Sequence, residues 1–254
     1  MNNSKLVYGI GLIALSLAVF FLATRAKDRL HIRFGDTHWG PPNSKPLDSF
    51  SITGVKQLNA NGSCDIELIP DDNERVVFYY DKEEVENEST VKDSSLNIDF
   101  KNDGGRLFRR KSERIVVKIY TRNINHIVQE GVGSISSASP LVHDQIKLSN
   151  DGVGSMEFIL QARNIEVSNG GVGSIDLKGN AEDALITNEG TGSIEADKLM
   201  LKRAKVSNQG IGSITVHASE TLDMTNQGIG SIDYYGEAKV TNSQSQGVGS
   251  INKN

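Results

Sequence analysis

Short runs of alternating hydrophobic and polar residues, broken by glycine corners, fill the second half of this chain. In AKVSNQGIGSITVHA, Val206 and Asn208 share one strand face, and Ile214 and Val216 share another, because side chains two residues apart in a strand point to the same side. The glycines between the two pairs indicate that the chain turns there. The pattern predicts two short strands joined by a corner.

This corner is repeated at a nearly constant interval. The word Gly-x-Gly-Ser-Ile/Met occurs seven times, at spacings of 21, 19, 19, 20, 18 and 19 residues. A period of about 20 residues with nothing helical inside it is the signature of a solenoid. We expect both glycines of each copy to supply the unusual backbone angles of the corner. They are Gly131, Gly133, Gly152, Gly154, Gly171, Gly173, Gly190, Gly192, Gly210, Gly212, Gly228, Gly230, Gly247 and Gly249.

Two columns of side chains are expected to run through the stacked coils, whose strands would pair in parallel at about 4.8 Å. The first column stacks the last residue of each repeat in the core, because no coil can bury its own apolar face. It consists of Ile135, Met156, Ile175, Ile194, Ile214, Ile232 and Ile251. The second is an asparagine ladder, in which side-chain amides hydrogen-bond from coil to coil at a buried corner. Its members are Asn150, Asn169, Asn188, Asn208 and Asn226.

The chain divides into three parts. Residues 1–26 are interpreted as a signal anchor or transmembrane segment, and residues 27–49, with three of the five prolines, as an extended tether. Residues 50–254 form the solenoid domain, in which 50–130 alternate like strands of irregular first coils and 131–254 hold the repeats. The exposed edge of the last coil could pair with a second copy, so we expect a homo-oligomer.

The run Leu6–Ala23 contains 18 uncharged residues, close to the length of a membrane-spanning helix. A retained anchor is favoured over a cleaved signal peptide, because no small-x-small cleavage site follows the run. The orientation stays open. Arg25, Lys27, Arg29 and Arg33 after the run place the domain in the cytoplasm by the positive-inside rule, whereas short N-terminal tails with one lysine also precede exported domains.

Composition excludes several function classes. A net charge of −5 and the absence of a large basic patch argue against nucleic-acid binding. The single cysteine, Cys64, excludes an intramolecular disulfide framework and a cysteine-based zinc site. No catalytic motif is present, and the five histidines lack metal-ligand spacing. We therefore expect no enzyme activity, no catalytic residue and no cofactor.

One row of acidic residues remains as a candidate site. Parallel stacking would place Glu157, Asp176 and Glu195 side by side on an outer face. The favoured interpretation is a solvated acidic face. The alternatives are a calcium site, or a glycan groove with a hydrolytic carboxylate pair, which would need one carboxyl group with a raised pKa.

The apolar N-terminal run, the opening FSITGVKQLNANGSCDIELIPDDNERVVFYY with VKDSSLNIDF, and the Gly-x-Gly-Ser-Ile repeats together resemble a bacterial family. It is the putative auto-transporter adhesin, head GIN domain family of Bacteroidetes. The resemblance covers residues 50–252, although the tripeptide Gly-Ile-Asn is absent and Ser250-Ile251-Asn252 comes closest. It implies a right-handed parallel β-helix, shaped like pectin lyases but without their catalytic residues, and export to the cell envelope. Adhesion is the role that the family suggests.

The leading hypothesis is a non-enzymatic protein of the cell envelope, all-β except for one N-terminal transmembrane helix. A right-handed parallel β-helix would present a repetitive surface to a glycan, an envelope protein or a host surface, as an adhesin does. The protein would lie in the inner membrane with its domain in the periplasm, or at the cell surface. A periplasmic scaffold or envelope-sensing module is the first alternative, and a polysaccharide-active enzyme of pectin-lyase shape is the second.

Overall fold

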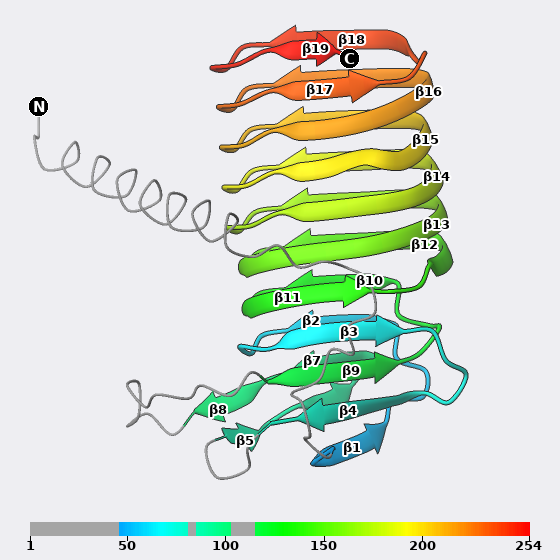
Figure 1. Cartoon of the computed structure of the whole chain (residues 1–254), viewed down its shortest axis with the longest axis vertical. Coiled ribbons are helices and arrows are strands. Elements are labelled where there is room, and N and C mark those ends of the chain that lie inside the picture. Colours follow the sequence, from blue (N-terminus) through cyan, green and yellow to red (C-terminus); the bar gives the residue numbers. More distant parts are fainter. Residues whose placement is uncertain (1–45, 81–84, 103–114) are drawn as a thin grey trace, which may run out of the picture. The chain divides into compact units, whose positions relative to one another are not determined.

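The computed structural model describes residues 46–80, 85–102 and 115–254, which hold strands and no helix (Figure 1). The first nine strands are β1 (Asp48–Ser51), β2 (Gln57–Ala60), β3 (Asp65–Ile69), β4 (Arg75–Tyr79), β5 (Val85–Asn87), β6 (Thr90–Lys92), β7 (Ser95–Ile98), β8 (Phe100–Asn102) and β9 (Val116–Tyr120). The others are β10 (His126–Gln129), β11 (Val132–Ser137), β12 (Leu141–Asn150), β13 (Val153–Asn169), β14 (Ile175–Asn188), β15 (Ile194–Asn208), β16 (Ile214–Asn226), β17 (Ile232–Tyr235), β18 (Lys239–Ser245) and β19 (Ile251–Lys253).

The repeats stack as parallel coils, which confirms the predicted all-β solenoid. Strands β13 to β16 each run along two faces of one coil and pair in parallel with the coils on both sides. The expected apolar column is in register throughout: Ile135 pairs with Met156, and the pairing continues through each repeat to Ile232 and Ile251. One coil of 18 to 21 residues is therefore one sequence repeat.

Neighbouring coils together form one continuous core. In β14, the buried apolar positions are Ile175, Leu177, Ala181, Ala184 and Ile186, and the side chains between them face outward. Alternation is interrupted near Ala181, where the strand bends from one face of the coil to the other. Since a fully buried isoleucine or leucine contributes about 1.5–3 kcal/mol, stacking rather than any single coil stabilises the fold.

The segment 50–130 joins the same sheet, but its strands do not stack in chain order. Strands β2 and β3 pair in parallel with β10 and β11 above them and with β7 and β9 below them. Strands β1 and β6 and the β4–β9 pair then add antiparallel pairings at this end. Aromatic rings fill the core beneath them, with centroids 5.6 Å apart for Phe50 and Phe78 and 6.1 Å apart for Phe78 and Phe100.

Two sequence expectations fall outside the described residues. The run Leu6–Ala23 and nearly all of the expected tether lie in the undescribed segment 1–45. Strand β1 begins at Asp48, just before the expected start of the solenoid at residue 50. Within the part of the chain that the structure describes, no helix is long and apolar enough to cross a membrane.

Candidate binding groove

The two glycines of each corner have different roles, which corrects the expectation that both adopt unusual backbone angles. The second glycine does so: Gly212 has φ of +142°, a region that other residues avoid. The first glycine, Gly210, is not among the positive-φ residues. It is required by close approach, because a methyl group there would overlap the carbonyl oxygen of Gly190 in the preceding coil.

Beneath the corners lies a column of buried amides. Asn150, Asn169, Asn188, Asn208 and Asn226 are at most 1% exposed. Each of the first four donates a side-chain hydrogen bond to the oxygen of the next, at 2.8, 2.9, 2.9 and 3.1 Å in turn. At the end of the run the amides also close the corner itself, since Asn226 Nδ2 donates to the carbonyl oxygen of Gly230 at 2.8 Å. The asparagine ladder thus bonds coil to coil along the column and, at Asn208 and Asn226, bonds to the corner carbonyls as well.

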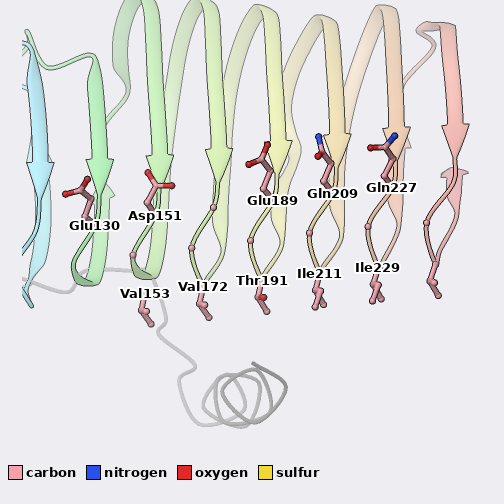
Figure 2. Close-up of a pocket in the computed structure, with 18 of the residues that line it drawn as sticks. Glu130, Asp151, Val153, Val172, Glu189, Thr191, Gln209, Ile211, Gln227 and Ile229 are labelled. Atoms are coloured by element: carbon pink, nitrogen blue, oxygen red, sulfur yellow. The ribbon is translucent and has the colours of Figure 1, made fainter. Parts of the chain in front are cut away.

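Above the ladder, two rows of side chains flank the corner glycines (Figure 2). The polar row consists of the residues that precede the first glycine of each repeat, six polar side chains and one glycine: Glu130, Asp151, Gly170, Glu189, Gln209, Gln227 and Gln246. The aliphatic row consists of the residues between the two glycines, six aliphatic side chains and one threonine: Val132, Val153, Val172, Thr191, Ile211, Ile229 and Val248. Parallel bridges hold the aliphatic row in register from coil to coil.

Between and along these rows runs a groove of about 790 Å³, floored by the glycines. It spans the corners from Glu130 to Val248, about 30 Å at the coil spacing. Its described lining residues include no lysine, arginine, histidine or aromatic side chain. Carboxylates are its only charged groups, and they lie in the half of the groove nearest β11, whereas the other half presents glutamines.

The aliphatic row is exposed toward both ends of the groove, where a corner would ordinarily be polar, and half-buried at Val172, Thr191 and Ile211 in the middle. Val153 is 46% exposed, Ile229 52% and Val248 72%. The corner backbone, by contrast, is already paired: Ile211 N–H donates to Gly190 O at 2.8 Å, and Gly212 N–H donates to Ile229 O at 2.8 Å. A ligand in the groove therefore meets side chains and glycine methylenes. An exposed apolar strip beside polar groups is typical of a binding surface.

The acidic row expected on an outer face is brought together as β13, β14 and β15 stack. Glu157 pairs with Asp176, and Asp176 with Glu195. The ammonium group of Lys178 lies among them, 2.6 Å from Glu157 Oε1 and 3.6 Å from Asp176 Oδ2. Burial, together with Glu157 and Glu195, raises the pKa of Asp176, while Lys178 opposes the rise. Repulsion within the row is thus relieved by a lysine side chain of the same face.

The other titratable residues do not gather into a site. Burial lowers the pKa of His126 and of His143, which lie in different coils. His31 and His38 lie outside the described residues. Burial raises the pKa of the Cys64 thiol to about 12, which disfavours the nucleophilic thiolate form. The described part of the chain holds no group of three or more His, Cys, Asp and Glu side chains placed for a metal ion.

Sequence reasoning missed the groove, although its signal was present. The x of Gly-x-Gly is Val, Val, Val, Thr, Ile, Ile and Val in successive repeats. β-Branched residues are unusual between two turn glycines, and here none of them enters the core. The expectation for the corners concerned the two glycines alone and assigned no role to the residue between them.

Comparison with known proteins agrees with this architecture. A solved structure described as a putative adhesin from Bacteroides fragilis NCTC 9343 is similar, with a TM-score of 0.73 and 26% identity over 84% of this chain and 99% of that one. A putative lipid-binding protein from Parabacteroides distasonis ATCC 8503 shares the fold, with a TM-score of 0.62 and 20% identity over 85% of this chain and 98% of that one.

A putative adhesin from Parabacteroides merdae ATCC 43184 also shares the fold, with a TM-score of 0.57 and 19% identity over 85% of this chain and 98% of that one. No protein of curated function matches the sequence. The model of one family, described as putative auto-transporter adhesin, head GIN domain, matches residues 55–238, well over half of the chain. On this match the protein belongs to the head GIN domain family of putative auto-transporter adhesins.

Proposed function

We propose that this protein is a non-enzymatic adhesin of the cell envelope that holds an elongated partner along the groove of its glycine corners. The observation that carries the proposal is the continuous pair of rows, one polar and one aliphatic, in register across the corner repeats. Most coils offer one polar and one apolar contact, except where Gly170 and Thr191 interrupt the two rows. A partner that spans several coils adds these weak contacts within one molecule, which raises affinity without any deep pocket.

The proposal also includes a membrane anchor, a handedness for the coils and a location in the cell. Residues 6–23 would anchor the domain to a membrane, since their length and apolar character suit a spanning helix. The coils would wind in the right-handed sense, because parallel strands joined by a crossover almost always do so. The family relationship supports a location in the cell envelope.

A matched pair of double variants tests the groove. Val153→Ser with Ile229→Ser removes two exposed aliphatic contacts of the groove, and both positions are about half exposed, so folding is preserved. Val142→Ser with Leu185→Ser is the control, because these side chains are 61% and 42% exposed and lie outside the groove. We expect retention of the full-length protein on immobilised cell-wall and mucin preparations to fall about tenfold for the first pair only. Equal retention by both pairs would refute the groove as the binding surface.

The location is tested by protease accessibility of a C-terminal tag. Cleavage in intact cells supports adhesion between cells. Cleavage only after the outer membrane is permeabilised favours a periplasmic scaffold instead. Protection until the inner membrane is broken contradicts both envelope locations.

One observation favours a second candidate function, a polysaccharide-active enzyme. The raised pKa of Asp176 beside Glu157 and Glu195 is a property that a general acid needs. The groove, however, lies at the corners, and Lys178 already bonds two of these carboxylates. Incubation with plant and bacterial polysaccharides decides between the two. Turnover that is abolished by Asp176→Asn with Glu195→Gln would establish the enzyme, and we expect no turnover in either protein.

A further inference from the structure

We propose that the occupant of the groove is a linear polysaccharide without anionic groups, lying along the solenoid axis with about one sugar residue on each coil. This inference rests on the proposed function and specifies the chemistry of its partner. It follows from the spacing, the composition and the charge of the two rows.

The spacing selects the polymer. Equivalent side chains recur along the groove at the coil spacing of about 4.8 Å, a length close to that of one linked pyranose residue. Two residues of an extended peptide, the smallest unit that returns to the same face, advance about 6.6–6.8 Å. A peptide would therefore lose register with the rows after two or three coils, whereas a glycan advances by about one residue for each coil. In a β-1,4-linked glycan the ring flips at each residue, so the same face returns at every second coil.

The chemistry of the rows fits a sugar ring. Its hydroxyl groups both donate and accept hydrogen bonds, as do the amides of Gln209 and Gln227, and its C–H face is apolar like Ile211 and Ile229. A peptide strand that binds by main-chain pairing needs an open sheet edge. The corner backbone offers none within the groove, because its amides are bonded between coils, as Val172 N–H is to Gly152 O at 2.9 Å.

The negative charge of the groove further limits the class of polysaccharide that can bind. The lining residues include Glu130, Asp151 and Glu189 and no basic side chain among those described. Ser149 Oγ donates to Asp151 Oδ2 at 2.8 Å at the groove wall. An anionic ligand, such as a uronic acid chain or an acidic lipid headgroup, would be repelled by these carboxylates, because no basic side chain among the described lining residues offsets them. Amino sugars are favoured in the carboxylate half, and neutral sugars suit the glutamine half.

The area of the strip argues against a second copy of this chain. The aliphatic row is one side chain wide and about 30 Å long. Its contact area, on the order of 300 Å² for each partner, falls short of the roughly 800 Å² for each partner of a stable protein interface. A single slender chain, held on two sides by the rows, is covered much more completely.

The test uses the full-length protein in detergent and three series of oligosaccharides of increasing length: glucosamine, N-acetylglucosamine and galacturonate oligomers. We expect affinity, measured by calorimetry, to rise with each added sugar and to level off near the number of coils that line the groove. We expect galacturonate oligomers to bind at least tenfold more weakly than glucosamine oligomers. Affinity that does not depend on length, or equal binding of galacturonate, would overturn the inference.

Variants connect these affinities to the rows. Asp151→Asn should reduce the preference for glucosamine over N-acetylglucosamine up to about fivefold, the effect of one exposed charge. Thr191→Trp places a bulky ring in the middle of the groove and should abolish the gain with length, while Leu185→Trp on another face should not. Thermal unfolding verifies that each variant is folded. Unchanged binding of all oligomers by folded Thr191→Trp protein would contradict the inference.

Other occupants appear as distinct results. The protein could bind no oligosaccharide but bind zwitterionic lipid vesicles or a basic peptide, and lose that binding in the Val153→Ser, Ile229→Ser variant. This result would refute the polysaccharide as the occupant and leave the groove as the binding surface. Retention on cell-wall and mucin preparations that is unaffected by that double variant would refute the proposed function itself.

Discussion

The asparagine ladder gives the sharpest prediction of stability. In the middle of the column, Asn188 accepts a hydrogen bond from Asn169 and donates one to Asn208, both at 2.9 Å, and it is fully buried. Asn188→Ala removes both bonds and leaves a donor on one neighbour and an acceptor on the other without partners. Each buried polar group left unpaired costs about 1–3 kcal/mol. We expect a total loss of about 4 kcal/mol.

This loss is measured by urea and thermal unfolding followed by circular dichroism. For a domain of this size, 1 kcal/mol corresponds to roughly 2–4 °C in Tm, so the expected decrease is roughly 8–16 °C. Asn188→Leu is the second variant, because its side chain fills the space and excludes a bridging water, so the loss should persist. Thr187→Ala, at the adjacent outward position, is the control and should lose less than about 1 kcal/mol.

The outcome would refute the reasoning in either of two ways. If Asn188→Ala loses no more stability than Thr187→Ala, the ladder bonds contribute nothing beyond those of a surface residue. Asn188→Leu as stable as the parent protein would show that the column needs bulk alone and not hydrogen bonds.

Three further predictions follow from the corners and the acidic row. Gly212→Ala places alanine in a backbone region that it avoids and makes its methyl group overlap Gly192 O, so the unfolding free energy should fall by at least about 3 kcal/mol. Gly54→Ala is the control: Gly54 has φ of +78° but open space around it, so the loss should be only about 1–2 kcal/mol. Because burial raises the pKa of Asp176 in the folded protein, the stability that this group contributes is complete below its unfolded pKa of about 3.9 and is lost as pH rises through the raised value. Asp176→Asn should therefore gain stability relative to the parent at pH 7 but not at pH 3, and unfolding curves that differ equally at the two pH values would contradict this. Ser245→Asn should extend the ladder by one member and raise the unfolding free energy by about 0.5 kcal/mol, a gain that an unchanged urea midpoint would exclude.

The repeat unit of this fold was predictable from the sequence. One coil equals one period, and the apolar residue after Gly-x-Gly-Ser recurs at the same point of every period, so stacking must align Ile175 with Ile194 and Ile194 with Ile214. The same argument places asparagine over asparagine. The strand register of a solenoid can be predicted from the repeat itself, because each coil pairs with the coils that adjoin it in the sequence.

The first coils show where this argument stops. Strand β3 lies between β9 and β11, although five other named strands, β4 to β8, come between β3 and β9 in the chain. Without a repeat, nothing in the local pattern of residues 50–130 states which strands are neighbours. Long-range packing of the aromatic and aliphatic residues at this end of the core decides it.

The candidate groove was likewise predictable only in part from the sequence. The sequence by itself determined the glycines, the carboxylates and amides before them, and the aliphatic residues between them, because each belongs to one repeated word. Only the tertiary structure decided that these positions form two continuous rows with a hollow between them, and that the Lys178 ammonium group lies against Glu157 and Asp176. The physical reason is that a surface is made of residues about 20 apart in the chain, and their spacing, exposure and charge exist only once the coils have stacked.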